Sequence, residues 1–414
     1  MSFFELNKNH SALSYSLPSE TIEKSALKYK LPKAVYVTQP TLPSLREYVG
    51  LLKKIWRSKW LTNNGVFHQE FEKKLAEYLG VKYCSLFCNG TLALLVGLKA
   101  LKLTGEVITT PFTFPATVNV LKWLNLTPVF ADIEEETFTI DTSKLERLIT
   151  AKTSAILPVH IFGNPCRVRE IQNIAARYGL KVIYDAAHCF GAKLDGEAMS
   201  SYGDASILSF HATKLFTTLE GGALIVKDEK LKKEVDLLKN FGIADEETVL
   251  TPGINAKLNE FQAAFGLLHL RMVEAQILKR KKIAILYREQ MKGIPGLVFP
   301  NDIPEVVHNY GYFPILVKED EFEMSRDQLY VCLKLFNVFA RKYFYPLISS
   351  YDFFNDLPSA QPGQLPVAER ITKEILCLPI YGNLSLKTVK TICEILSYIY
   401  DHKDELKPMI IDYR

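Results

Sequence analysis

Short apolar segments alternate with amphipathic helical segments along this chain, and that alternation limits its fold more than any other feature. Apolar runs of strand length lie at residues 106–110, 128–132, 154–160, 181–185, 205–210 and 223–226. Between two of them, residues 168–178 place apolar side chains at helical spacing and end at Gly179. Strands that are apolar along their whole length need cover on both faces. We therefore expect an α/β fold with a large, mostly parallel sheet between two layers of helices.

Three further segments are predicted to be helical. One carries apolar side chains four residues apart and stops at Gly80, a glycine C-cap; these side chains are Phe67, Phe71, Leu75 and Leu79. Residues 92–103 are a dense apolar run that favours a buried helix. Glu146 follows Ser143 by three residues in the capping-box pattern, so residues 143–149 are also predicted to form a helix.

The length of the chain, 414 residues, exceeds what one simple hydrophobic core holds. After the sheet segments the pattern changes to a predicted strand at residues 310–317 and helices at residues 325–336 and 386–400, which is typical of a smaller α+β domain. The expected division is an N-terminal extension at residues 1–32, a large α/β domain at residues 33–290 and a small C-terminal domain at residues 291–414.

Charge and hydropathy exclude several classes of partner. The net charge is +4 and the charged residues are spread through the chain, so nothing favours a nucleic-acid partner. No apolar stretch approaches the roughly 18 residues of a membrane span. Residues 1–30 lack the charged start and apolar run of a signal peptide, and the cysteines have no metal-ligand spacing. We expect a cytoplasmic protein with no membrane partner and no metal.

Reactive side chains follow two of the predicted strands. Asp185 ends the strand at residues 181–185, and Lys214 follows the strand at residues 205–210. Ligands in open α/β sheets bind at the carboxyl ends of strands. Pyridoxal 5'-phosphate (PLP) needs a lysine to form an imine and an acid to keep its pyridine nitrogen protonated. Each residue alone has a plain structural interpretation, as a helix cap or a surface charge, but together they suit PLP.

Two other segments suit the phosphate and the ring of such a cofactor. Asn89, Gly90 and Thr91 precede a predicted helix, whose first backbone N–H groups bind phosphate well. Ser209 offers a second hydroxyl. Phe114 lies just past a strand end, where it is placed to stack on a pyridine ring. The structural alternatives are a plain turn for residues 89–91 and core packing for Phe114. There is no GxxxxGK[ST] or GxGxxG motif, which disfavours ATP and NAD.

These segments, in this order, resemble the sugar-nucleotide aminotransferases of PLP fold type I, the DegT/DnrJ/StrS group. The resemblance covers about residues 35–400, and its most specific part is the block from Ser209 to Lys214 together with Glu220-Gly-Gly. The fold it implies is aspartate aminotransferase-like, with a large α/β domain and a smaller C-terminal domain. Two departures are Asn89, where many relatives have Ser, and His188, where Gln is common.

The resemblance implies roles for individual residues. Lys214 would bind PLP covalently and shuttle protons, Asp185 would pair with the pyridine nitrogen, and His188 would lie near the phenolic oxygen. Asn89, Gly90, Thr91 and Ser209 would hold the phosphate, with Asn255 reaching the phosphate of a second subunit in a homodimer with shared active sites. The residues expected to border the substrate are Thr62, Asn63, Asn64 and His211.

The implied reaction transfers an amino group from an amino acid, with L-glutamate expected, to a nucleotide-linked keto-6-deoxyhexose for bacterial surface polysaccharide such as O-antigen. dTDP-4-keto-6-deoxy-D-glucose is the favoured substrate. The 3-keto isomer and a UDP-linked 4-keto sugar are alternatives. Related sugar dehydrases carry His where this chain has Lys214, which argues for transamination. A lyase and a non-catalytic binding protein with this fold are more remote possibilities.

Overall fold

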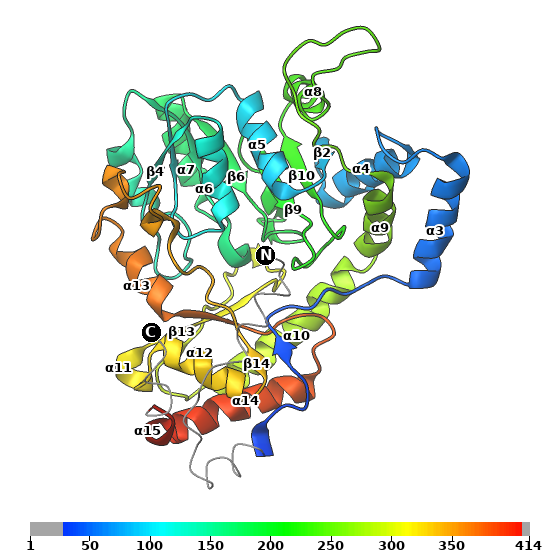
Figure 1. Cartoon of the computed structure of the whole chain (residues 1–414). Helices are drawn as coiled ribbons and strands as arrows, with labels where there is room; N and C mark the ends of the chain where they lie inside the picture. Colours follow the sequence, from blue (N-terminus) through cyan, green and yellow to red (C-terminus); the bar gives the residue numbers. More distant parts are fainter. Residues whose placement is uncertain (1–27, 408–414) are drawn as a thin grey trace.

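The computed structural model describes residues 28–407, and a seven-stranded sheet lies at the centre of that part of the chain (Figure 1). Its strands are β2 (Tyr83–Phe87), β3 (Glu106–Thr109), β4 (Thr127–Phe130), β5 (Thr153–Leu157), β6 (Lys181–Asp185), β9 (Ala205–Ser209) and β10 (Gly222–Val226). The strand order is β2-β10-β9-β6-β5-β3-β4. Only β10 runs antiparallel to its neighbours within this sheet. The predicted α/β class with a mostly parallel sheet is confirmed.

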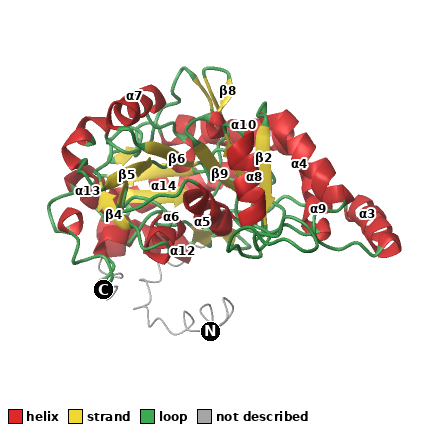
Figure 2. Ribbon diagram, turned by 90° about the horizontal axis from the view of Figure 1, so that it is seen from above, coloured by secondary structure: helices red, strands yellow, loops and turns green. Residues whose placement is uncertain are grey.

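Helices cover both faces of the sheet (Figure 2). They are α4 (Val66–Leu79), α5 (Gly90–Ala100), α6 (Pro115–Trp123), α7 (Val168–Tyr178), α8 (Glu229–Leu238) and α9 (Glu260–Leu270). Side chains alternate between the faces along each strand. Ile183 packs in the core formed with α5 and α6, whereas its neighbours Val182 and Tyr184 pack in the core beside α7. Apolar residues at consecutive positions are therefore needed on every inner strand.

Glycines end two of the predicted helices as expected. Gly80 after α4 and Gly179 after α7 adopt left-handed backbone angles, with φ of 66° and 67°. The helix predicted at residues 143–149 is wrong: the chain forms two single 3₁₀ turns, Thr142–Lys144 and Glu146–Leu148. Asp141 takes the cap position and accepts from the Ser143 N–H, and Ile149 is already extended. The segment is too short to continue as an α-helix.

The C-terminal elements form a second layer below the central sheet in Figure 1. Their strands are β11 (Leu297–Val298), β13 (Phe313–Val317), β14 (Val338–Phe339) and β15 (Ile375–Leu378). Their helices are α11 (Glu319–Phe322), α12 (Arg326–Leu335), α13 (Pro366–Glu374), α14 (Leu386–Asp401) and α15 (Lys403–Leu406). The strand order β11-β13-β15 makes an antiparallel sheet. Ser325 and Ser385 cap α12 and α14, and Ser325 forms a complete capping box with Gln328.

Segments from the expected large domain also pack against this second layer. The strand β1 (Val35–Tyr36) pairs with β14, and the second half of α10 (Val273–Met291) contributes Tyr287 and Met291 to the same core. The boundaries at residues 32 and 290 stay a prediction. Most of the expected extension, residues 1–27, lies outside the described residues.

The remaining elements lie at the periphery. The helix α3 (Leu45–Ser58) stands away from the body of the molecule in Figure 1 and packs on α9. A small sheet has the order β12-β7-β8, formed by β7 (Lys193–Leu194), β8 (Glu197–Ala198) and β12 (Val306–Val307). Between residues 28 and 407, no helix has the length and apolar character that crossing a membrane requires.

Candidate active site

Asp185 and Lys214 meet at one edge of the central sheet. β6 and β9 are neighbouring parallel strands, with Asp185 paired in register with Ile207. Asp185 is the last residue of β6, and Lys214 lies on the turn that follows β9. Parallel strands bring their carboxyl ends to the same edge, so the predicted pairing of this acid with this amine follows from strand order.

Two hydrogen bonds hold the Asp185 carboxylate, which is buried. Thr117 Oγ1 donates to one carboxylate oxygen at 2.7 Å, and the Ala187 N–H donates to the other at 3.0 Å. The Thr117 hydroxyl is itself bonded to Thr113 at 2.8 Å. Burial raises the pKa of Asp185, while both hydrogen bonds and the charge of Lys214 lower it without cancelling the rise. The carboxylate is thus fixed in one orientation.

The Lys214 amine is set up to react. Its Nζ donates to the Tyr312 hydroxyl at 3.0 Å. Burial lowers the pKa of Lys214 to about 8, and the nearby charge of Asp185 opposes that change. Tyr312 stays protonated because burial raises the pKa of its hydroxyl. A lysine with this pKa has a substantial neutral fraction near pH 8, and a neutral amine is the form that attacks a carbonyl.

His188 is neutral, and its hydrogen bonds define its tautomer. The Phe162 N–H donates to His188 Nδ1 at 3.0 Å, so the ring proton is on Nε2. Burial lowers the pKa of His188 far below its usual range, and the charge of Lys214 adds to that effect. Phe162 adopts a left-handed φ of 56°, uncommon for a bulky side chain, in making this contact. The ring therefore offers an N–H donor at Nε2.

The turn between β2 and α5 provides a phosphate cradle beside β9. Asn89 caps α5 by accepting from the Leu92 N–H at 2.8 Å. The first N–H groups of the helix, on Gly90 and Thr91, have no acceptor within the helix, as at any helix start. A Cβ on Gly90 would lie 3.1 Å from the Cβ of Ser209, so glycine lets the turn approach the end of β9. Helix N–H groups beside a serine suit an oxyanion.

An open cavity adjoins this edge of the sheet. Its volume is about 380 Å³, and Phe114 lines it together with Tyr343 and Phe344. Phe114 is the N-cap of α6 and is 58% exposed. Phe344 lies parallel to the His188 ring at 6.0 Å between centroids. The predicted ring-stacking residue thus borders free space next to the reactive side chains.

Residues 46–397 match the DegT/DnrJ/EryC1/StrS aminotransferase family. The chain belongs to this family. The transferase is 52% identical to the dTDP-4-amino-4,6-dideoxy-D-glucose transaminase of Escherichia coli, covering 88% of this chain and 98% of that protein. The Shigella dysenteriae protein of the same name is 45% identical, over 91% of this chain and 100% of its own length.

A solved structure agrees with the fold of this aminotransferase. The structure of DesI in the presence of its TDP-sugar product superposes with a TM-score of 0.88 at 31% identity, over 94% of this chain and 100% of that one. The predicted family and fold type are confirmed. PLP is the cofactor of this family of aminotransferases, and the reactive amine, the fixed acid and the cradle beside Ser209 fit its aldehyde, pyridine nitrogen and phosphate.

Several predicted site residues of the aminotransferase lie apart from this cluster within one chain. Thr62, Asn63 and Asn64 form an exposed turn between α3 and α4. Asn255 is also exposed, although its neighbour Ala256 accepts from the Cys88 N–H next to the cradle. His211 is exposed, and its Nδ1 is bonded to Thr213 at 2.8 Å. Their proposed contacts need a substrate or a second subunit.

Three residues near the site were missed by sequence reasoning. Thr117 lies three residues after Phe114 in the sequence, but no role was assigned to it. Tyr312 lies just before β13, where it resembles an ordinary strand aromatic. Arg341 follows β14 and lines the cavity beside Phe114. Among these only Thr117 had a usable signal, a second hydroxyl four residues after Thr113 on a helix that starts at a strand end.

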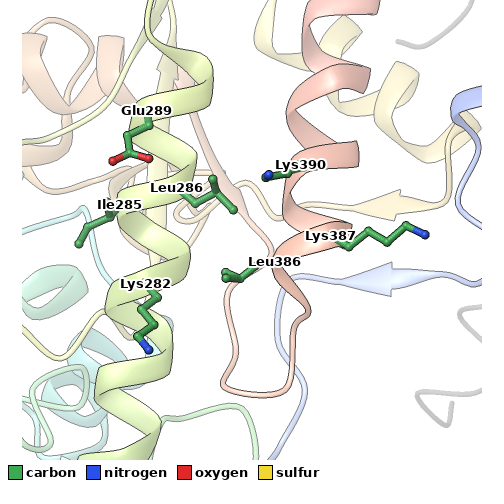
Figure 3. Close-up of a pocket in the computed structure, with 7 residues that line it drawn as sticks. All are labelled: Lys282, Ile285, Leu286, Glu289, Leu386, Lys387 and Lys390. Carbon is green, nitrogen blue, oxygen red and sulfur yellow. The ribbon is translucent and has the colours of Figure 1, made fainter.

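A larger cavity of the described chain lies elsewhere. It is a groove of about 590 Å³ between α10 and α14 (Figure 3). Its lining residues are Lys282, Ile285, Leu286, Glu289, Leu386, Lys387 and Lys390. None of the predicted site residues lines it. The candidate active site of this aminotransferase therefore does not lie in this larger cavity.

Proposed function

We propose that this aminotransferase moves the amino group of L-glutamate to C4 of dTDP-4-keto-6-deoxy-D-glucose. The observation that carries the proposal is Lys214, with its lowered pKa, beside Asp185 at one sheet edge. The choice of sugar and nucleotide is supported by the two transaminases at 52% and 45% identity, which match nearly their whole lengths. The product would serve bacterial surface polysaccharide, and the reaction would take place in the cytoplasm.

We assign the cofactor contacts as follows. When bound, PLP supplies the electron sink that lets a proton leave the donor Cα. Lys214 would hold the cofactor covalently in the resting enzyme, and its Nζ would move that proton when it is not bound to the cofactor. Asp185 would keep the pyridine nitrogen protonated, and the Nε2–H of His188 would donate to the phenolic oxygen. Gly90, Thr91 and Ser209 would bind the phosphate, and Asn89 supports that turn by capping α5.

A homodimer would bring the outlying residues to the site. Exposed apolar side chains lie on α3, between α3 and the start of α4, and on the loop at residues 241–254; they are Leu45, Trp56, Trp60, Val66, Phe241, Val249 and Leu250. Exposed apolar side chains of this size are typical of subunit interfaces. Asn255 adjoins this loop and is exposed, which suits a contact with the partner's phosphate. The turn at residues 62–64 and His211 would then border the substrate, with Phe114 against the cofactor ring.

The test separates the cofactor step from the sugar step. Purified holoenzyme should lose its visible absorbance band when L-glutamate is added, and then regain it with dTDP-4-keto-6-deoxy-D-glucose. Mass spectrometry should show the 4-amino sugar. Lys214→Ala should abolish both changes, and Lys292→Ala, an exposed lysine, should abolish neither. Preferential amination of a 3-keto or UDP-linked sugar would contradict the proposed substrate. An absorbance band that does not change when glutamate is added would contradict the proposed donor.

A further inference from the structure

The cavity beside Phe114 is connected to the reactive cluster through its walls. Thr113 lines it and bonds to Thr117, which bonds to Asp185. Tyr343 lines it as well, and its ring contacts that of Tyr312, the partner of Lys214, at 6.0 Å between centroids. A reactant whose reacting carbon is at Lys214 would therefore extend into this space.

Arg341 enters this cavity from a fixed backbone. The Arg341 N–H donates to the Cys377 carbonyl at 3.1 Å, and the Cys377 N–H donates to the Arg341 carbonyl at 2.7 Å. Cys377 is buried in β15. The position of Arg341 is thus set by the C-terminal sheet, while its side chain is exposed and lines the cavity.

The charge of Arg341 is not compensated, in contrast to that of its neighbour. Lys342 lines the same cavity but pairs with Asp327 at 2.6 Å, and Arg326 pairs with the same carboxylate. Among residues 28–407, no carboxylate lies within 4.0 Å of the Arg341 guanidinium. A cation with no carboxylate partner among these residues therefore faces a cavity with aromatic walls next to the reactive amine.

We propose that Arg341 binds an oxyanion of a reactant, which is a carboxylate of the amino donor or the diphosphate of the sugar nucleotide. The inference rests on the proposed function, because both anions come from its substrates. A guanidinium matches carboxylate and phosphate oxygens in a planar, two-point geometry that an ammonium does not reproduce. Arg341 would be a binding residue that fixes reactant orientation and takes no part in proton transfer.

Equilibrium binding tests this without turnover. Glutarate and thymidine 5'-diphosphate are titrated by calorimetry into PLP-loaded wild-type protein, Arg341→Gln and Arg341→Lys. The Gln variant should bind at least one of the two about 10- to 100-fold more weakly, as expected for loss of a charge-assisted hydrogen bond. The Lys variant should recover part of that loss. The probe whose binding is weakened in the Gln variant identifies which reactant supplies the anion.

Arg169→Gln is the matched control, because its side chain is 84% exposed and pairs with Asp195 on the surface. It should bind both probes as the wild type does. Unchanged binding of both probes by Arg341→Gln, or equal weakening in the Arg169 variant, would overturn the inference. Wild-type protein whose absorbance band ignores glutamate would instead refute the proposed function, so the two failures are distinguishable.

Kinetics of the half-reactions give an independent readout. Loss of a binding contact should raise the KM for the reactant whose anion Arg341 holds, with a smaller change in kcat. Arg341→Lys should lower that KM again. A fall in kcat alone, with KM unchanged in both half-reactions, would contradict a binding role.

Discussion

At the scale of single residues, Lys214 is under two opposing influences. Burial lowers its pKa from 10.5 to about 8, and the carboxylate of Asp185 pulls it upward. The neutral fraction of the Lys214 amine at the pH of a cell is therefore larger than that of a surface lysine. Tyr312 accepts its hydrogen bond and holds the amine near the edge of the sheet. The reactivity of the site is therefore a consequence of burial balanced by one nearby charge.

This balance predicts a pH dependence for the apoenzyme. The rate of PLP capture should rise about tenfold per pH unit below pH 8, because the neutral fraction of Lys214 grows, and level off above it. Stopped-flow absorbance at excess PLP measures it. Nα-acetyl-lysine under the same conditions is the control for titration of PLP itself. Asp185→Asn should move the midpoint to lower pH, since it removes the charge that raises the pKa. A rate still rising steeply at pH 10 would contradict the assignment.

At the scale of elements, the side chain of Glu260 links the N-terminus of α9 to that of α4 by hydrogen bonds. Glu260 is the first residue of α9, and its buried carboxylate accepts from the N–H groups of Phe67 and His68 at 2.9 and 2.8 Å. Gly65, the N-cap of α4, has no side chain to do this. A Cβ there would lie 2.5 Å from the carboxylate carbon. A charge from one helix thus stabilises the positive end of another.

Removing this cap should destabilise the protein. Glu260→Ala leaves two buried N–H groups without acceptors and should lower the free energy of unfolding by about 2–5 kcal/mol. Urea denaturation measures it. Gly65→Ala should destabilise as well, because its methyl group displaces the carboxylate. Glu246→Ala, on an exposed loop, should change stability by less than about 0.5 kcal/mol. A Glu260→Ala loss no greater than that of the control would show that the cap contributes little.

At the scale of the whole molecule, α3 and the loop at residues 241–254 expose apolar side chains that one chain leaves uncovered. We expect Trp60→Arg with Leu250→Arg to convert the proposed dimer into a monomer, because charges replace side chains that are 57% and 64% exposed. Sedimentation velocity measures this. Trp123→Arg is the control, since Trp123 lies on α6, which belongs to neither segment, and is 81% exposed.

Asn255→Ala separates assembly from cofactor binding. It should leave the dimer intact and speed PLP loss on dialysis, whereas the monomeric double variant should lose PLP through the missing partner. Equal PLP retention in wild type and Asn255→Ala would refute the contact across subunits. A double variant that stays dimeric would refute this interface.

The sequence by itself determined the features that depend on neighbouring residues. Continuous apolar strands predicted the parallel sheet, and glycines after apolar helical faces located the ends of α4 and α7. Asp185 and Lys214 were predicted to act together because Asp185 ends one strand and Lys214 lies on the turn after another, and strand ends in such sheets collect on one edge. The same local reasoning failed at residues 143–149, where Asp141 competes for the cap and the segment is too short to continue as a helix.

Only the tertiary structure decided the contacts between distant residues. Tyr312 meets Lys214 across 98 residues of chain, and Glu260 reaches Phe67 across 193. Asp327 pairs with Lys342 and Arg326 but not with Arg341, because of how α12 packs beside β14. Burial, which sets the pKa of Lys214, depends on all these packed elements together. Local patterns fix which residues stand at strand and helix ends, but charge balance and solvent exclusion arise only when those ends are brought together.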